Sequence, residues 1–193
     1  MDFKNAKELL TLCQDHQLPI SEIMRQREII VGETTDESVN SRMARVLEIM
    51  KDAAFSPVKT PVKSMGGLIG GEARKLCEFH DLGKSLCGNV LGKGITYAMA
   101  TLETNASMGL IVASPTAGSA GIVPGMMLAL QEVYGFSDKK IRQALFNAGA
   151  IGYLAMRNAT VAGAVGGCQA EVGIASAMAV SAAVELLGGT PLQ

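Results

Sequence analysis

The segment with the most evident chemistry runs from Asn158 to Gly173 and reads NATVAGAVGGCQAEVG. It places Cys168 directly after two glycines and ahead of a run of small residues that predicts a helix. A thiol at a helix N-terminus meets the positive end of the helix dipole, which stabilises its thiolate. Thiolates bind soft metals and iron–sulfur clusters, although one cysteine cannot hold a cluster. A small, buried and inert thiol is the alternative interpretation of Cys168.

Few polar side chains accompany Cys168 in the second half of the chain. Glu171 follows three residues later, where it either complements the helix dipole or serves as a buried acid near a site. Asn105, Asn158 and Gln169 lie in apolar stretches and need hydrogen-bonding partners, in the core or in a site. Glu171 is therefore a candidate catalytic acid or base, and Asn105 and Asn158 are candidate substrate-binding residues.

A second stretch, Ser114–Gly121, reads SPTAGSAG and combines three hydroxyls with a proline and two glycines. The proline stiffens the turn, and the glycines let the backbone approach a ligand closely. The stretch leads into a predicted helix, whose free N–H groups favour an anion. Ser114, Thr116, Gly118 and Ser119 therefore predict a site for a small carboxylate or phosphate. An ordinary Ser/Thr N-cap after a proline turn is the alternative.

Composition limits the classes of partner. The 193-residue chain carries 17 basic and 18 acidic side chains, so bulk charge favours neither nucleic acid nor a membrane surface. Aromatic residues make up 4% of the chain and Trp is absent, which argues against platforms for base stacking. The four cysteines form no CxxC pair, and no signal peptide is visible. We expect a cytoplasmic protein with reduced thiols.

A membrane span is one alternative for the uncharged run from Thr104 to Gln131. This run exceeds the ~20 residues that a spanning helix needs. Its prolines and glycines would break the helix in mid-bilayer and leave backbone groups unpaired. A buried interior is the better interpretation of this run.

Charged residues are distributed unevenly, with 27 of the 35 in residues 1–103. The first half therefore predicts amphipathic surface helices, and the second half predicts helices that are apolar on nearly every face. The pattern favours an all-α bundle of about seven to eight helices with a central, apolar, Ala/Gly-rich C-terminal half. Helices are expected at residues 3–16, 19–32, from 34 to about 50, 71–82, 88–108, 120–134, from 137 to about 151, and 168–187.

Residues 56–71 contain two prolines and four glycines, and this composition predicts a linker or loop. It separates a helical N-terminal arm, residues 1–55, from the remaining domain portion, residues 56–193. The alternative is one continuous domain, 1–193, in which this loop folds over a site.

Taken together, the two chemical stretches resemble the alpha subunit of the iron–sulfur-dependent L-serine dehydratases. The resemblance rests on Ala113–Gly121 and Arg157–Gly173, and the string GGCQAEVG within the second is highly specific. It extends through GGLIGG at 66–71, TNASMG at 104–109 and Ala148–Ala150 to ISEIM at 20–24. Nearly the whole chain is covered.

The resemblance implies a lyase that converts L-serine to pyruvate and ammonia without pyridoxal phosphate. In that family three cysteines hold a 4Fe–4S cluster with one open iron, which acts as a Lewis acid on the substrate hydroxyl. Cys168 matches the first of these cysteines, and the Ser114–Ser119 loop is expected to help hold the substrate carboxylate. A beta subunit is the implied partner, in a homo- or hetero-oligomer.

The sequence also departs from this family. Its members continue beyond the segment that matches Gly188–Pro191, and the two further cluster cysteines occur there. Cys77 and Cys87 lack that context, so the ligand role is not carried over to them. We therefore expect this chain alone to carry no cluster and to be inactive. A helical small-anion-binding or subunit-interaction module without catalysis is the rival interpretation.

Overall fold

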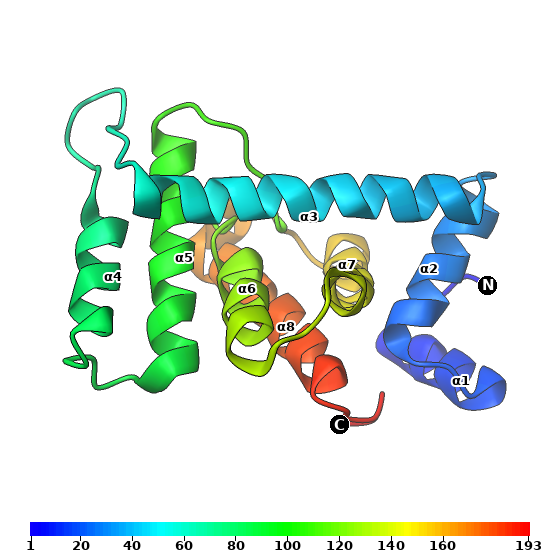
Figure 1. Ribbon diagram of the computed structural model, residues 1–193. Helices are drawn as coiled ribbons and strands as arrows, with labels where there is room; N and C mark the ends of the chain where they lie inside the picture. Colours follow the sequence, from blue (N-terminus) through cyan, green and yellow to red (C-terminus); the bar gives the residue numbers. More distant parts are fainter. The chain divides into compact units, whose positions relative to one another are not determined.

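A computed structural model describes all 193 residues, and all of its regular elements are α-helices (Figure 1). This confirms the predicted all-α class. The helices are α1 (Ala6–His16), α2 (Ile20–Val31), α3 (Asp36–Lys59), α4 (Glu72–Asp81), α5 (Gly88–Ala106), α6 (Ile122–Tyr134), α7 (Asp138–Asn158) and α8 (Gly163–Leu186).

The helices belong to two compact units. Unit 1 comprises residues 1–45 and 137–193, and unit 2 comprises residues 46–136. Helix α3 begins in unit 1 and ends in unit 2. The division into these units does not test whether residues 1–55 fold as a separate arm. The boundary expected at residue 55 therefore stays a prediction.

In unit 1, the N-terminal segment packs on α2 and α7 around a buried arginine. The Arg27 guanidinium lies 3.9 Å from the centre of the Tyr153 ring and forms an ion pair of 2.7 Å with Asp2. Phe3 is fully buried and meets Tyr153 edge to face, with ring centres 5.4 Å apart. The stacked aromatic face and the carboxylate together compensate for the burial of the Arg27 charge.

A polar network lies at the contact between α7 and α8. Asn147 is 1% exposed, and its Nδ2 donates to Glu185 Oε2 at 2.8 Å while Ser181 Oγ donates to its Oδ1 at 2.7 Å. The same Glu185 oxygen accepts the backbone N–H of Ser21 at 3.1 Å. One carboxylate therefore connects α8 with both α7 and the start of α2.

Helix α8 is less buried than the sequence predicts. Only Ala175, Met178, Ala179 and Ala182 are buried, although the helix is apolar on nearly every face. By length and composition it is the one helix that could cross a membrane, and 22% of its apolar window is buried. Helix α8 packs on α7 along one side. It is therefore not a central helix of unit 1, despite its apolar composition.

In unit 2, α5 and α6 approach through small residues. A Cβ added to Gly121 would lie 2.5 Å from the Ala98 carbonyl oxygen, and one on Gly125 would lie 2.6 Å from that of Gly94. Backbone therefore meets backbone where the helices cross. Seven residues of α6 are buried, from Val123 to Leu130, so this helix does occupy the centre of its unit as predicted.

The loop expected at 56–71 begins later, because α3 continues through Pro57 to Lys59. Proline has no N–H, so a proline inside a helix leaves the carbonyl four residues earlier without its usual donor. That carbonyl belongs to Ala53, and it accepts the Thr104 hydroxyl of α5 at 2.8 Å. The prediction of a loop start at residue 56 was wrong because a partner distant in sequence satisfies this carbonyl.

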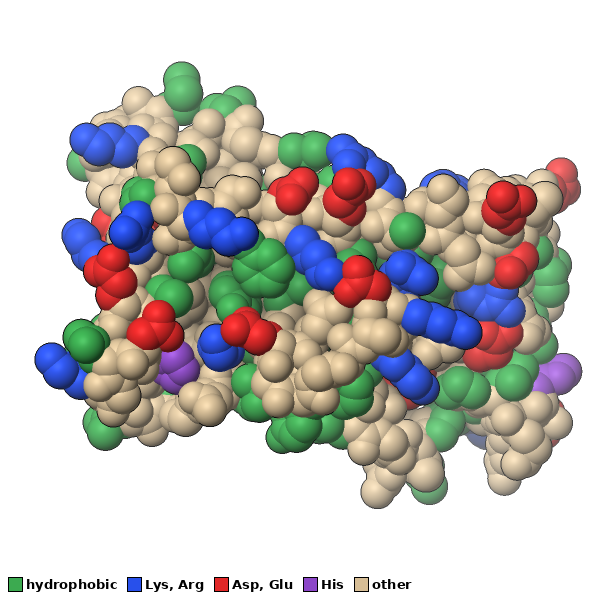
Figure 2. Space-filling model, viewed as in Figure 1, with side chains coloured by type: hydrophobic (Ala, Val, Ile, Leu, Met, Phe, Trp, Pro, Cys, Tyr) green, Lys and Arg blue, Asp and Glu red, His purple; other side chains and the backbone are tan.

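Side chains cap two of the helices whose starts the sequence predicts. Ser137 accepts the backbone N–H of Lys140 at the start of α7, and Thr35 accepts that of Ser38 at the start of α3. Along α3, Figure 2 shows basic and acidic side chains interspersed on the face in view. This matches the balanced composition of the first half of the chain.

The close crossing of α5 and α6 predicts that replacing Gly125 destabilises the fold. Gly125→Ala places a methyl group against the Gly94 carbonyl, so we expect a loss of about 1–3 kcal/mol in the free energy of unfolding. Urea denaturation followed by circular dichroism measures the loss.

The matched control is the glycine across the same crossing. A Cβ on Gly94 would have its nearest neighbours at 3.6 and 3.9 Å, which is ordinary contact. Gly94→Ala should therefore be neutral or stabilise by about 0.5–1 kcal/mol, as Ala does elsewhere in helices. Equal losses in the two variants would contradict the close crossing.

Candidate functional site

The C-terminal end of α5 anchors two loops of unit 2, residues 60–71 and 107–121 (Figure 1). The backbone N–H of Met65 donates to the Ala106 carbonyl at 3.2 Å. Asn105 Nδ2 donates to the Ala117 carbonyl at 3.2 Å. Asn105 therefore holds the 107–121 loop to α5. The Ala117 carbonyl is the hydrogen-bonding partner that the Asn105 amide was expected to need.

The Ser114–Gly121 stretch is a tight turn ahead of α6. Its Ser114–Pro115 peptide bond is cis, and the Ser114 N–H donates to the Thr116 carbonyl at 3.4 Å. Gly121 occupies the N-cap position of α6, and no side chain caps this helix. The interpretation of the stretch as a Ser/Thr N-cap is therefore wrong, and its hydroxyls are available for other contacts.

The three hydroxyls of this turn differ in their surroundings. Ser119 is 2% exposed, and its Oγ lies 3.4 Å from the Ser114 carbonyl and 3.2 Å from the Thr116 hydroxyl. Ser114 is 4% exposed, and its Oγ is buried with no hydrogen-bonding partner. A buried polar atom without a partner is rare in folded proteins. Ser114 is thus the hydroxyl whose partner is missing.

The backbone adds a further donor at this place. At the start of α6 the Ile122 N–H donates to the Ser119 carbonyl and Pro124 has no N–H, so the Val123 N–H is the first-turn donor that remains for a ligand. Gly118 is exposed, so a small ligand can approach the backbone there. The combination of a buried free hydroxyl with a helix N-terminus suits an anion.

The glycine-rich segment of residues 64–71 lies at the same end of α5. Its ends are tied by the Ser64 N–H, which donates to the Ile69 carbonyl at 2.8 Å. Gly70 and Gly71 have φ angles of 149° and 92°, and a Cβ on Gly70 would collide with the Val62 carbonyl. Only glycine suits these positions. Anchoring at Ala106 places this segment beside the α5 end.

Glu103 is a residue of this region that the sequence interpretation missed. It is 2% exposed, and its Oε1 accepts the Ala73 N–H at the start of α4 at 2.8 Å. Helical spacing could have revealed it, since Gly92, Thr96, Ala100 and Glu103 follow one another at intervals of three and four along the buried face of α5. A charged residue on that face signals a specific partner.

Cys168 lies in unit 1 at a break within α8. Gly167 has φ 77° and ψ 168°, which are not helical values, so a short helical segment ends there and a longer one begins at Cys168. The predicted placement of the cysteine after a glycine turn and at the start of a helix is confirmed. Its side chain is exposed and is a free thiol, so the alternative of a buried thiol is wrong.

Two other predicted site residues of unit 1 lie close to Cys168 in sequence. Glu171 is half-buried, and its carboxylate lies over Gly163, where an added Cβ would be 2.6 Å from Oε2. Asn158 Nδ2 donates to the carbonyls of Leu154 and Lys4, both at 2.9 Å. That amide therefore ends α7 and fastens the N-terminal segment, which is a structural use of its donor group.

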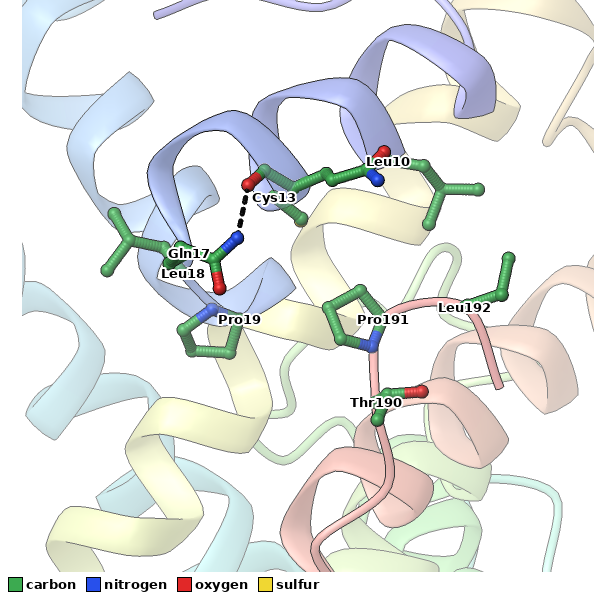
Figure 3. Close-up of a pocket in the computed structure, with 9 residues that line it drawn as sticks. Leu10, Cys13, Gln17, Leu18, Pro19, Thr190, Pro191 and Leu192 are labelled. Atoms are coloured by element: carbon green, nitrogen blue, oxygen red, sulfur yellow. Dashed lines mark hydrogen bonds between the residues drawn. The ribbon is translucent and has the colours of Figure 1, made fainter.

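Unit 1 also holds a cavity of about 440 Å³ between the end of α1 and the C-terminal tail (Figure 3). Gln17 Nε2 donates to the Gln14 carbonyl at its edge, at 2.7 Å. None of the predicted site residues lines it; the lining residues are Leu10, Cys13, Gln14, Gln17, Leu18, Pro19, Thr190, Pro191 and Leu192.

Comparison with known proteins identifies a family for the chain. The family described as serine dehydratase alpha chain matches residues 15–193. The chain belongs to this family. It is 44% identical over 191 residues to the probable L-serine dehydratase alpha chain of Bacillus subtilis, and 40% identical over 185 residues to the L-serine dehydratase alpha chain of Peptoniphilus asaccharolyticus.

The serine dehydratase relatives are longer than this chain. The matches cover 99% and 96% of the chain but 63% of each of the two alpha-chain relatives. An L-serine dehydratase of Helicobacter pylori is 35% identical over 195 residues, which is the whole chain and 43% of that relative. The chain thus represents about two thirds or less of each of these serine dehydratase polypeptides.

The iron–sulfur cluster that the resemblance implies can be tested against the donors of this chain. No three His, Cys, Asp or Glu side chains come together, and all four cysteines are free. A 4Fe–4S cluster is ordinarily held by about four ligands. The donor set of this serine dehydratase chain therefore does not fit a complete cluster site, and Cys168 can supply one ligand.

The exposure and pKa of the cysteines predict the order in which they are alkylated. Cys87 and Cys168 are exposed, and Cys13 is buried. Burial raises the pKa of Cys13 to about 11, and burial followed by the Asp81 carboxylate raises the pKa of Cys77. Because the thiolate is the reactive form, iodoacetamide at pH 8 should modify Cys87 and Cys168 first, Cys77 more slowly, and Cys13 only in denaturant.

Mass spectrometry of peptides after timed quenching gives the order. Complete labelling in urea is the control, since it makes all four thiols equally accessible. Rapid labelling of Cys13 in the folded protein would contradict its placement in the core of unit 1.

Proposed function

We propose that this chain is the alpha-type portion of a bacterial L-serine dehydratase, which deaminates L-serine to pyruvate and ammonia. The names of its relatives support this proposal, and the loops at the end of α5 offer a site for the substrate carboxylate. A cytoplasmic location and assembly with a beta subunit, in a homo- or hetero-oligomer, belong to the same proposal.

The observation that carries the proposal is the buried Ser114 hydroxyl without a partner. A carboxylate of L-serine at the turn would accept its O–H and the Val123 N–H at the start of α6. Thr116 is half-buried and already faces Ser119, so its hydroxyl is a second, weaker donor. The exposed Gly118 allows the backbone to close on the ligand. Hydrogen bonds to an anion are stronger than those between neutral groups.

The proposed reaction removes the α-proton and the β-hydroxyl of L-serine as water and forms aminoacrylate. Hydrolysis of aminoacrylate then gives pyruvate and ammonia. Cys168 is proposed as one ligand of a 4Fe–4S cluster in the complete enzyme. Glu171 is three residues further along α8 and so on the same side of the helix, which supports a role in proton transfer. Ser119 and Asn105 position the proposed carboxylate turn through their contacts with Ser114 and Ala117.

The rival proposal is a small-anion-binding or subunit-interaction module without catalysis. The carboxylate turn is compatible with it, because binding of an anion there does not depend on a cluster. Both proposals predict anion binding at Ser114. They differ in whether the chain contributes to serine deamination when a beta subunit is present, and an assay of pyruvate formation in the assembled protein distinguishes them.

Replacement of the orphan hydroxyl tests the carboxylate site. Ser114→Ala removes a donor that makes no hydrogen bond within the chain. We expect affinity for L-serine to fall about tenfold, the value of one hydrogen bond to a charged group. Chemical-shift titration of the amides of residues 114–123 measures this affinity.

Ser107→Ala is the matched control, because this hydroxyl at the same α5 end already donates to the Thr104 carbonyl at 3.0 Å. It should leave L-serine affinity unchanged. Thermal stability of Ser114→Ala should equal or exceed that of the wild type, since no partner is left unsatisfied. A stability loss without a change in affinity would assign Ser114 to the fold alone.

Reconstitution tests whether this chain alone can retain a cluster. After anaerobic incubation with iron and sulfide, we expect the chain alone to hold far less than one cluster and to form no pyruvate from L-serine, because one thiolate cannot retain a cluster. Iron analysis and the visible absorption spectrum measure this. Cys168→Ser should look the same as the wild type. Stoichiometric cluster binding by the wild-type chain would contradict the prediction.

A further inference from the structure

Unit 1 holds a second cavity, of about 410 Å³, which the proposed reaction does not use. It lies between α1, α7, α8 and the C-terminal tail, and it shares Leu10 and residues 190–192 with the cavity of Figure 3. The two cavities therefore adjoin each other. A volume of this size suits a small organic ligand, and no residue of the proposed serine site lines it.

The walls of this second cavity are mostly apolar. Leucine and isoleucine side chains of α1 and α7 face valine side chains of α8; they include Leu9, Leu10, Ile151, Leu154 and Val184. Sites for small molecules combine such walls with a few polar groups that converge on one point. The convergent polar groups here are those of the contact between α7 and α8.

Asn147, Ser181 and Glu185 form the polar end of the cavity. The Ser181 hydroxyl donates to Asn147 Oδ1 at 2.7 Å, and Asn147 Nδ2 donates to Glu185 Oε2 at 2.8 Å. The Ser21 N–H donates to the same Oε2 at 3.1 Å. The Asn147 and Ser181 side chains are thus engaged within the chain, whereas Glu185 Oε1 accepts no hydrogen bond from it. The polar end therefore offers a carboxylate oxygen as acceptor.

The charge of the cavity also favours a donor. Glu185 is the one charged residue among those that line the two cavities, and no Lys, Arg or His lines either of them. A half-buried carboxylate beside apolar walls attracts a cation more strongly than a carboxylate in bulk water does. An ammonium group both carries that charge and donates a charge-assisted hydrogen bond to the free oxygen.

We propose that this cavity binds a primary alkylammonium ion, with its ammonium group on Glu185 Oε1 and its apolar chain between α1, α7 and α8. An alcohol with the same chain lacks the positive charge. An α-amino acid with the same chain adds a carboxylate, for which the lining provides no cation. The site belongs to unit 1 and does not depend on the proposed serine site.

Three probes with one apolar chain test the chemical class: 3-methylbutylamine, 3-methyl-1-butanol and L-leucine. In a chemical-shift titration of the 193-residue chain, the amine should shift the amides of Asn147, Ser181 and Glu185 saturably. The alcohol and L-leucine should bind at least about tenfold more weakly, the value of one hydrogen bond to a charged group. Absence of saturable amine binding, or equal binding of either other probe, would overturn the proposal.

Glu185→Gln tests the carboxylate itself. Glutamine keeps a side-chain oxygen that can accept from Ser21 and Asn147, but it lacks the charge. Affinity for 3-methylbutylamine should fall about tenfold or more. The control is Glu37→Gln, an exposed acid of α3 in unit 1 that lines neither cavity, and it should leave the affinity unchanged. Unchanged affinity in Glu185→Gln would contradict recognition by this carboxylate.

Ala177→Phe tests the cavity without altering the polar network. Ala177 is exposed and lines the cavity, so a phenyl ring there should fill it and abolish amine binding. Val172→Phe, at an exposed position of α8 that lines neither cavity, should bind normally. Size exclusion at several concentrations tests a second copy of the chain as the occupant. A wild type that self-associates and excludes the amine, with a monomeric Ala177→Phe, would overturn the proposal.

Discussion

The free N–H groups at helix starts impose the constraint on which both units depend. Helices α2 and α4 begin after Pro19 and Gly71, and neither has a side-chain cap. In each case a glutamate from a later helix accepts the N–H of the second helical residue: Glu185 accepts that of Ser21, and Glu103 accepts that of Ala73. A local cap would stabilise one helix alone, whereas these carboxylates make the start of one helix conditional on the placement of another. Each unit therefore contains a long-range contact that couples its helices.

The features that the sequence predicts well are those decided within a few residues. Ser137 caps α7, and Gly167 interrupts α8 directly before Cys168, because caps and glycine turns need only local geometry. The course of α3 through Pro57 could not be predicted, since it depends on Thr104 reaching the Ala53 carbonyl from α5. The same holds for the site. The Ser114–Gly121 stretch carries its own hydroxyls and glycines and can be recognised in the sequence, while Glu103 acquires its role only where it meets the Ala73 N–H.

Small residues have different consequences in the two units. In α6, Gly121 and Gly125 bring the helix backbone against Ala98 and Gly94 of α5, so small side chains produce close packing and burial. In α8, the glycines at 167 and 173 have no neighbouring atoms that a Cβ would meet. Both helices are rich in small residues. A helix becomes buried only where the backbone of a facing helix lies close against those residues. This is why the predicted central position holds for α6 and not for α8.

Within the Ser114–Gly121 turn, the hydroxyls have different roles: one maintains the turn, and another has no partner within it. Ser119 contacts the Ser114 carbonyl and the Thr116 hydroxyl, so it maintains the turn. Asn105 holds the turn to α5 from outside. These contacts place the Ser114 hydroxyl in a buried position and give it no acceptor. The Ser114 hydroxyl makes no hydrogen bond within the chain, so it does not stabilise the turn. Alanine at this position would leave the turn at least as stable. The cost of burying that hydroxyl is offset when a group outside the turn, a bound water or a ligand, accepts its proton.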